Sequence, residues 1–241
     1  MSDLIRLKYA HTTDVNIDGM YVEQDTQMRA KVKNVAATKD VRAHYNNGSG
    51  TWLDITLPWL ANYGDYDLFG RDGGFFTHEL VVSCTQAGIT DWDNYGSANY
   101  LVGDSRSVAG DNVVLNQAVA RQGTEAGGGF VFETSWMEGS ILVNNLSFAK
   151  RVGIRYTANH GVTWNDTAAT YGGPFISEYP AAPPGDAEQW NFKTGEFNLD
   201  NASAVFEFAV YYQRLDTGEW FWDNNFFQNY KLSKVAGSTI E

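Results

Sequence analysis

The chain carries the same series of short sequence blocks twice, and this internal repeat limits the possible folds more than any other feature. Four blocks recur in one order and share aligned asparagine, lysine, tryptophan and Asp-Asn positions. The blocks, each given as first copy and second copy, are 31–45 and 142–156, 51–54 and 163–166, 78–84 and 206–212, and 91–102 and 221–232. The repeat predicts two domains of one kind in tandem.

The boundary between the copies is marked by a change in composition that ends in three consecutive glycines. We therefore place the first domain at 1–108, a linker at 109–128 and the second domain at 129–241. The linker has room for a short helix around 112–121. The second copy is longer by the segment 169–189, whose prolines and glycines predict an inserted loop.

The blocks in each copy are short, rich in β-branched and aromatic residues, and alternate between apolar and polar positions. Val41, Ala43 and Tyr45 occupy one face of a predicted strand, while Arg42 and His44 occupy the other. About seven or eight such strands per copy, separated by turns, are typical of an antiparallel β-sandwich. The predicted fold class is therefore all-β, with two antiparallel β-sandwich domains in tandem.

The charge and the cysteine content exclude several classes of function. The formal net charge is −12 and the pI is near 4.7, which argues against nucleic acid as a partner because phosphates attract basic surfaces. Cys84 is the only cysteine, so neither an intramolecular disulfide nor a thiolate metal cluster can form. No stretch is typical of a signal peptide or of a membrane-spanning helix. We expect a soluble chain with a neutral ligand and no membrane partner, and a piece of a longer secreted protein would look the same.

Aromatic side chains gather beside short amides near the end of the second copy. Residues 219–232, EWFWDNNFFQNYKL, combine six aromatic residues with three asparagines. Trp52 and Trp164 follow the polar stretches NNGSGTW and ANHGVTW, which are typical of exposed loops. A pyranose ring offers a C–H face to an aromatic plane and hydroxyl groups to amides and carboxylates. The pattern therefore favours an oligosaccharide or polysaccharide as the ligand.

The repeated blocks resemble the starch-binding and glycogen-binding carbohydrate-binding modules of family 21. The second copy has NLSFAKRV at 145–152, Trp164, EFAVYY at 207–212 and WDNNFFQNY at 222–230, in the order of the family. The first copy is a weaker match, although its closing block WDNYGSANY is similar. The resemblance implies immunoglobulin-like β-sandwiches that bind α-1,4-glucan, such as starch or glycogen, without catalysis and without a cofactor. It also implies either an amylolytic enzyme in a longer parent chain or a glycogen-targeting subunit of protein phosphatase 1, whose short basic-hydrophobic docking motif is missing here.

The resemblance also implies which residues contact the sugar. The main site of the family pairs the loop tryptophan with the aromatic residue before Asp-Asn, and a second site uses the aromatic residue of the N-[LIV]-x-[FY] motif. The candidates in the second copy are Trp164, Trp222, Asp223, Asn224, Asn229 and Tyr230 for the main site, and Phe148 with Lys150 on the same strand face for the second. The candidates in the first copy are Trp52, Trp92, Asp93, Asn94, Asn99 and Tyr100. The first copy has Ala37 in place of Phe148, and Val81 and Ala209 replace an aromatic residue that some members carry.

Several of these candidates also have a purely structural interpretation. Trp222 can plug the core at the start of a strand, and core positions explain Tyr100 and Tyr230 as well as sugar contact does. Asp93 and Asp223 are expected mainly to brace their loops by accepting backbone N–H groups. Both interpretations stay open for these residues.

One short motif suggests a metal ion. Residues 14–25, DVNIDGMYVEQD, fit the D-x-N-x-D-G start of a calcium loop, with Asp14, Asn16, Asp18 and Asp25 as candidate ligands. The same segment aligns with a strand of the second copy, and two of its positions are apolar where such loops are polar. A plain Asx/Gly turn is therefore the preferred interpretation, and no metal is expected.

The leading hypothesis is a non-catalytic tandem carbohydrate-binding protein with a glucan as its partner. The alternatives are a free lectin for another glycan and a protein-interaction module that uses the same aromatic surface. An enzyme is disfavoured, because the copies share no pair of glutamates in an active-site-like context and no nucleophile or phosphate-binding motif occurs.

Overall fold

The chain divides into two compact units of similar construction. The residues described by the computed structural model are 3–17, 20–102, 106–176, 184–198 and 204–241. The first unit comprises Met1–Asp111 and Pro174–Ala187, and the second unit comprises Asn112–Gly173 and Glu188–Glu241. Within the described ranges, no helix has the length and apolar character needed to cross a membrane.

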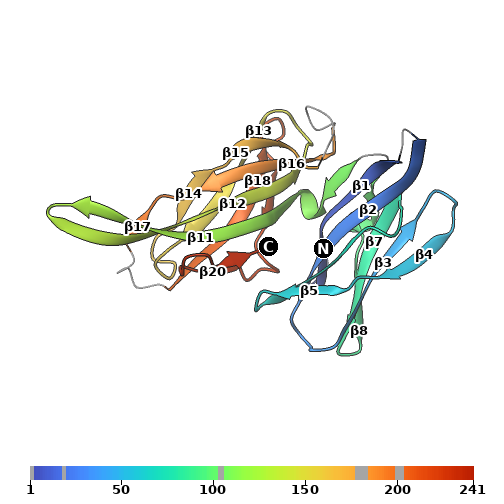
Figure 1. The fold of residues 1–241 in the computed structure, drawn as a ribbon, viewed down its shortest axis with the longest axis horizontal. Helices are drawn as coiled ribbons and strands as arrows, with labels where there is room; N and C mark the ends of the chain where they lie inside the picture. The colour runs from blue at the N-terminus through green and yellow to red at the C-terminus, as the bar shows by residue number, and fades with distance from the viewer. Residues whose placement is uncertain (1–2, 18–19, 103–105, 177–183, 199–203) are drawn as a thin grey trace. The chain divides into compact units, whose positions relative to one another are not determined.

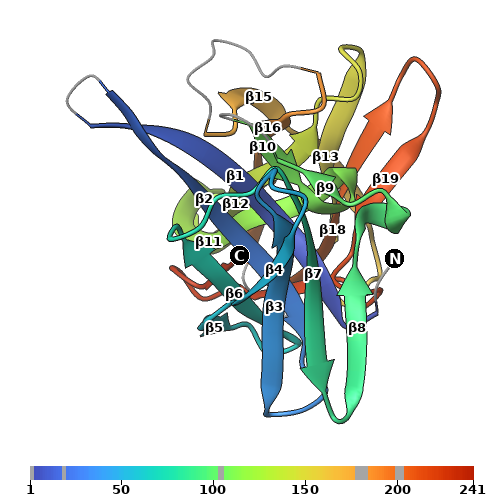
Figure 2. The same ribbon diagram turned by 90° about the vertical axis from the view of Figure 1, so that its right-hand side faces the viewer.

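The first unit is a sandwich of two antiparallel β-sheets (Figure 2). One sheet has the order β10-β1-β2-β6-β5, with β1 at Ile5–Ile17, β2 at Met20–Lys33, β5 at Trp59–Asn62, β6 at Tyr66–Asp72 and β10 at Ser107–Ala109. The other has the order β4-β3-β7-β8, with β3 at Lys39–Asn46, β4 at Trp52–Thr56, β7 at Glu79–Gln86, β8 at Ile89–Asp93, and β9 at Tyr100–Leu101 beside β7. A 3-10 turn, η1, occupies Tyr95–Ser97.

The second unit has two sheets of the same kind (Figure 1). One has the order β15-β16-β12-β11-β21, with β11 at Val113–Gly127, β12 at Phe130–Asn144, β15 at Thr170–Pro174, β16 at Ala187–Lys193, β21 at Thr239–Ile240, and β17 at Phe197–Asn198 beside β12. The other has the order β14-β13-β18-β19, with β13 at Lys150–Thr157, β14 at Asn165–Ala168, β18 at Val205–Arg214, β19 at Trp220–Asp223, and β20 at Tyr230–Ser233 beside β18. A second 3-10 turn, η2 at Gly110–Asn112, precedes β11.

The strand orders of the two units correspond element by element. The corresponding strands of the first unit and the second unit are β10 and β21, β1 and β11, β2 and β12, β6 and β16, β5 and β15, β4 and β14, β3 and β13, β7 and β18, β8 and β19, and β9 and β20. The repeat in the sequence therefore corresponds to a repeat of the fold. The predicted class, all-β with two immunoglobulin-like antiparallel sandwiches, is confirmed.

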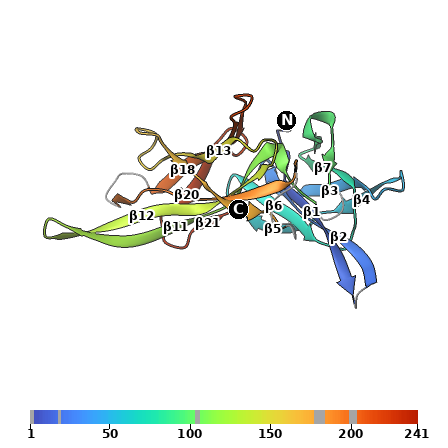
Figure 3. The ribbon, with the colours of Figure 1, turned by 90° about the horizontal axis from the view of Figure 1, so that it is seen from above.

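The segment between the sequence copies differs from the prediction. Most of the expected linker at 109–128 is strand β11, which pairs with β12 from Val113↔Val143 to Gly127↔Phe130 (Figure 3). The prediction of a linker with a short helix was wrong here, because β11 is the counterpart of β1. Without β11, one side of β12 would lack its neighbouring strand. The three glycines form the turn of this hairpin, where Gly128 and Gly129 have positive φ angles of 60° and 85°.

The expected inserted loop at 169–189 is partly strand, because it includes β15 and the start of β16, and only the segment between these two strands is a connection. Its described ends belong to the first unit, where the Phe175 ring contacts the edge of Tyr9 at a centroid distance of 5.0 Å. Arg106 Nε donates a hydrogen bond to Asp186 Oδ1 at 2.6 Å in the same unit. Residues 177–183 lie outside the described ranges.

The predicted alternation holds in β3. Val41 and Ala43 are buried in the core of the first unit, Tyr45 packs against that core, and Arg42 is exposed. The outward positions of this strand, and of its counterpart β13, are thereby available for a site on the outer face of the sheet.

The calcium loop suggested by residues 14–25 is not formed. Asp14 and Asn16 lie in β1, where they pair with Gln24 and Tyr21 of β2, so the segment is a hairpin instead of a ligand loop. The Asp25 carboxylate accepts a hydrogen bond from the Gly74 backbone N–H at 2.7 Å. Asp18 lies outside the described residues, and among those described no group of three or more His, Cys, Asp or Glu side chains is placed to hold a metal ion.

Candidate functional site

A groove opens on the outer face of the β14-β13-β18-β19 sheet in the second unit. It has a volume of about 480 Å³ and is lined by Arg155, Trp164, Ala209, Trp222, Asn224 and Asn229. The alternation of β13 and β18 explains two of these positions, because Ile154 and Val210 face the core while Arg155 and Ala209 are paired neighbours on the other face. Strands β13, β18 and β19 and the loops before β14 and after β19 therefore contribute to one hollow.

The two tryptophans of this groove are accessible. Trp164, in the loop before β14, is 44% exposed, and Trp222 on β19 is half-buried. The interpretation of Trp222 as a core plug is therefore wrong. Both rings keep part of their apolar area in contact with water, and this area is available to a ligand.

A charged pair holds one wall of the groove. Arg155 donates from Nε and Nη2 to the two carboxylate oxygens of Asp166 at 2.9 and 2.8 Å. The hydrogen bond from Arg155 lowers the pKa of Asp166, and the same bond raises the pKa of Arg155. The guanidinium carbon lies 5.7 Å from the ring centre of Trp222, within the range of a cation–π contact. Arg155 is thus fixed between a carboxylate and an indole ring.

The loop between β19 and β20 presents the two asparagines through an unusual backbone. Asn225, Phe226 and Phe227 are consecutive residues in the left-handed region, with φ angles of 50°, 55° and 68°. Each such residue costs about 1–2 kcal/mol when it is not glycine, so the surroundings must hold this turn. Asn224 Oδ1 accepts from the Phe227 N–H at 3.2 Å, and Asn229 Nδ2 donates to Glu207 Oε1 at 2.9 Å.

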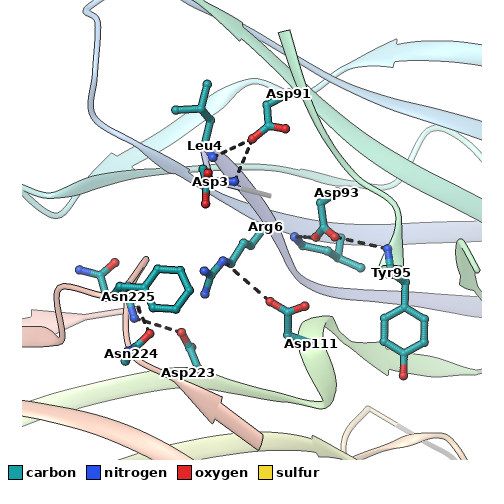
Figure 4. Close-up of polar contacts among 12 residues, drawn as sticks. Asp3, Leu4, Arg6, Asp91, Asp93, Tyr95, Asp111, Asp223, Asn224 and Asn225 are labelled. Carbon is teal, nitrogen blue, oxygen red and sulfur yellow. Dashed lines mark hydrogen bonds and ion pairs between the residues drawn. The ribbon is translucent and has the colours of Figure 1, made fainter. Parts of the chain in front are cut away.

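A buried carboxylate anchors the start of this loop. Asp223 Oδ2 accepts from the Tyr230 hydroxyl and, at 3.0 Å, from the Leu115 N–H. Asp223 Oδ1 accepts from the Asn225 N–H at 3.3 Å (Figure 4). Asp223 is 3% exposed and Tyr230 is fully buried. Neither side chain can reach a sugar, so their assignment as sugar contacts is corrected in favour of the bracing interpretation.

The first unit repeats this anchor. Asp93 accepts from the Leu7 N–H at 2.7 Å and from the Tyr100 hydroxyl at 2.8 Å. It also accepts from the Tyr95 N–H at 3.4 Å (Figure 4). Burial raises the pKa of Asp93, and burial likewise raises the pKa of Tyr100 well above its ordinary value. Asp93 and Tyr100 are buried, so their assignment as sugar contacts is corrected for the same reason.

The outer face of the first unit brings its remaining candidates together in a different way. The His44 ring stacks on Trp52 with centroids 4.9 Å apart and an interplanar angle of 14°. His44 also meets Trp92 edge-on at 6.0 Å, and its Nδ1 lies 2.8 Å from Asp54 Oδ1. Trp92 is 46% exposed and Trp52 is half-buried, but an imidazole already covers one face of Trp52.

The asparagines of the first unit follow the pattern of the second. Asn94 Oδ1 accepts from the Ser97 N–H at 3.1 Å, and Asn99 Nδ2 donates to Glu79 Oε1 at 2.7 Å. Tyr95, Gly96 and Ser97 form the corresponding left-handed turn, with φ angles of 50°, 66° and 77°. The loop geometry of the two units is therefore the same, and the difference lies in the side chains on the sheet.

The two candidates for the second family site do not lie together on one strand face. Phe148 lies in a bend before β13 and is fully exposed. Lys150 is buried at the start of β13, where its Nζ donates to Glu188 Oε2 and to Asn145 Oδ1, both at 2.7 Å. The expectation of a shared strand face is wrong, because the strand begins two residues after Phe148 and Lys150 turns inward to its partners.

Sequence reasoning missed part of the groove lining. Arg155 and its partner Asp166 were not among the candidates, and neither was Trp220, which is 45% exposed two residues before Trp222. The signal for Trp220 was present, because side chains at i and i+2 of a strand share a face. Arg155 required the pairing of β13 with β14, which one strand alone does not reveal.

Comparison with known proteins found a family model and a similar solved structure. Residues 111–233 match the model of the carbohydrate/starch-binding module (family 21), which is more than half of the chain. Among solved structures, the chain is similar to the solution structure of the carbohydrate binding module of the muscle glycogen-targeting subunit of Protein Phosphatase-1, at 27% identity and a TM-score of 0.31 over 49% of this chain and 76% of that one. Through its second unit, the chain belongs to the carbohydrate/starch-binding modules of family 21.

Proposed function

We propose that the chain binds α-1,4-glucan, as in starch, glycogen or maltooligosaccharides, through the groove of the second unit and without catalysis. The observation that carries the proposal is the accessibility of Trp164 and Trp222 on one hollow beside Asn224 and Asn229. The indoles offer planes for the C–H faces of sugar rings, and the asparagine amides offer both donors and acceptors for hydroxyl groups. The family match supports carbohydrate as the ligand.

The shape of the groove suits a curved chain. Trp164 comes from a loop and Trp222 from a strand, and the small side chain of Ala209 also lines the hollow. A helical α-glucan presents a convex surface, and such a surface can enter this hollow.

The carboxylates beside the groove are occupied in ways that suit binding and not hydrolysis. Asp166 receives both of its hydrogen bonds from Arg155, and Glu207 receives one from Asn229. Glycosidic cleavage needs one carboxyl group that donates a proton and another that acts as base or nucleophile. Arg155 lowers the pKa of Asp166, which is the wrong direction for a proton donor.

The first unit contributes a weaker surface of the same kind. It presents Trp52 and Trp92 with Asn94 and Asn99, but the stacked His44 competes with a sugar for the face of Trp52. We therefore assign the main affinity to the second unit. The partner is the polysaccharide itself, and an amylolytic enzyme in a longer parent chain would be carried to its substrate by this binding.

Isothermal titration with maltoheptaose tests the proposal. Trp164→Ala and Trp222→Ala should each weaken binding by about tenfold or more, because each removes an aromatic plane whose contact is worth on the order of 1–2 kcal/mol. Trp59→Ala is the matched control, since Trp59 is an exposed tryptophan of the first unit outside this groove.

Three results would contradict the proposal. If a chain carrying both Trp164→Ala and Trp222→Ala binds maltoheptaose as tightly as the wild type, the groove is not the binding site. Retention on another glycan of an array, but not on starch or amylose, would point to a lectin of different specificity. Release of reducing ends from soluble glucan would show an enzyme.

A further inference from the structure

The aromatic surface of the second unit continues beyond the groove along β19. Trp220 and Trp222 alternate with Phe221 and therefore share the outer face of the sheet. Their ring centres lie 5.9 Å apart and their planes are nearly parallel, at 12°. Trp220 is 45% exposed although it lies outside the groove lining. An indole with this much exposed area on a sheet has the size and form of a ligand platform.

Tyr211 supports both indoles. It lies on β18 directly opposite Trp222, and its ring centre is 5.3 Å from that of Trp222 and 5.5 Å from that of Trp220. The tilts toward the two indoles are similar, at 53° and 57°. Tyr211 is 5% exposed and packs over Gly153 of β13, where an added Cβ would lie 2.6 Å from the tyrosine oxygen. The glycine makes room for the tyrosine, and the tyrosine holds the indole pair.

The first unit shows that the fold does not need this arrangement. In the corresponding register, Ser83 lies opposite Trp92, and Thr85 lies opposite Thr90 where the second unit has Gln213 opposite Trp220. The position of Gly153 is taken by Arg42, which pairs with Ser83. The first unit therefore has an ordinary polar sheet face here, with a Thr85–Thr90 hydroxyl hydrogen bond of 2.8 Å.

Three positions differ together between otherwise equivalent sheets. Gly153, Tyr211 and Trp220 replace an arginine, a serine and a threonine, and all three meet at one place on the outer face. Since the first sandwich forms with the polar set, this fold does not require the aromatic set, and the exposed Trp220 suits a use in binding. Its position next to Trp222 ties that use to the ligand of the groove.

We propose that Trp220 forms a further sugar subsite beside Trp222, so that a glucan chain lying in the groove continues along β19. This inference rests on the proposed function and deepens it, because it makes the site selective for longer stretches of glucan. A short oligosaccharide fills only the groove. A longer one also covers Trp220 and gains an additional aromatic contact, so affinity rises with chain length until that subsite is filled.

Titration of the full chain with maltotriose and with maltoheptaose tests the subsite. Trp220→Thr gives the second unit the residue of the first and should lower maltoheptaose affinity by about tenfold, while maltotriose affinity stays within about twofold. Trp220→Phe keeps an aromatic plane and should retain most of the gain with chain length. Phe130→Ala, which removes another exposed aromatic side chain of this unit, should leave both affinities unchanged. The indole N–H signal of Trp220 in a ¹H–¹⁵N spectrum should shift with maltoheptaose and not with maltotriose.

The outcomes separate the subsite from the groove. If Trp220→Thr weakens both oligosaccharides equally, Trp220 only supports Trp222 and the subsite is refuted. If the gain with chain length survives in Trp220→Thr while Trp164→Ala still abolishes binding, the subsite fails and the proposed function stands. If wild-type protein binds neither oligosaccharide, both fail together.

Discussion

At the scale of single residues, the acidic position of the Asp-Asn pair illustrates how a motif residue can serve a ligand without touching it. Asp93 and Asp223 are buried, and each ties a loop to a distant strand through backbone N–H groups and a tyrosine hydroxyl. A carboxylate at the surface would be free to bind a hydroxyl group of a sugar. Here it instead fixes the loop that carries the asparagines.

Removing one hydroxyl should separate these two roles. Tyr230→Phe deletes the hydrogen bond to Asp223 inside the core and should lower the free energy of unfolding by about 1–3 kcal/mol, because a buried acceptor loses a partner. Urea denaturation measures the loss, and maltoheptaose affinity of the folded protein should stay within about twofold. Tyr171→Phe, at an exposed phenol, is the control. Loss of affinity with unchanged stability would place the Tyr230 hydroxyl in the sugar site after all.

The Arg155–Asp166 pair sets the pH dependence of the groove. The pKa of Asp166 is lowered in the folded protein by the hydrogen bond from Arg155, so the ion pair is fully present above the unfolded pKa of an aspartate, about 4, and is lost as the pH falls through the folded pKa. We expect constant affinity from about pH 5 to 8 and weaker binding in stronger acid. Titration calorimetry from neutral pH into stronger acid measures this pH dependence. In Asp166→Asn, the loss of affinity in acid should disappear. A midpoint near pH 6.5 would point to a histidine instead.

Residue identity alone predicted some of the site and missed the rest for a physical reason. The accessibility of Trp52 and Trp164 followed from the polar loops before them, which is local information. The burial of Lys150 depends on Glu188, 38 residues away, and no local pattern contains that partner. Long-range pairs of this kind appear only once the sheets are assembled.

At the scale of elements, alternation was the most dependable signal and composition the least. The pattern of β3 placed Val41 and Ala43 inside and Arg42 outside, as the structure has them. Composition suggested a linker for the segment that is β11, because its outer half is polar and glycine-rich. That half lies in a long hairpin whose residues are mostly exposed. Its polar composition therefore results from contact with water on both faces of the hairpin, and a strand is present all the same.

The counterparts β3 and β13 also predict how the first unit can be improved as a binder. His44 and Arg155 occupy the same register position, but His44 stacks on the loop tryptophan Trp52, whereas Arg155 lies over the strand tryptophan Trp222. In a chain carrying Trp164→Ala and Trp222→Ala, His44→Ala should raise the residual maltoheptaose affinity by about three- to tenfold, since it frees a ring face. Arg42→Ala on the same strand is the control. An unchanged or lower affinity would mean that His44 does not compete with the sugar.

At the scale of the whole molecule, two sandwiches of one plan carry candidate sites that differ in their side chains. The shared parts are the strand order, the left-handed turns and the buried Asp–Tyr anchors. The parts that differ are the outward residues of the central strands, which do not affect the core. Two such sites on one chain make the second contact with a polymer an intramolecular event.

Amylose should therefore bind more tightly than maltoheptaose, by up to about a hundredfold per site, if both units engage one polymer. Replacing Trp52 and Trp92 together by alanine should remove most of this excess and leave maltoheptaose affinity nearly unchanged. Retention on amylose, measured against a soluble maltoheptaose competitor, gives both quantities. Equal affinities for polymer and oligosaccharide would refute the joint action of the units.

The left-handed turn at Asn225–Phe227 has a consequence for the kinetics and heat of recognition. Its backbone is already bent into a costly shape and anchored from the core before any sugar arrives. A receptor prepared in this way has little chain entropy left to lose on complex formation, so encounter should proceed without a slow rearrangement step. The same rigidity fixes the distance between the two amides, so a glucan can hydrogen-bond to both only if its hydroxyl groups match that distance.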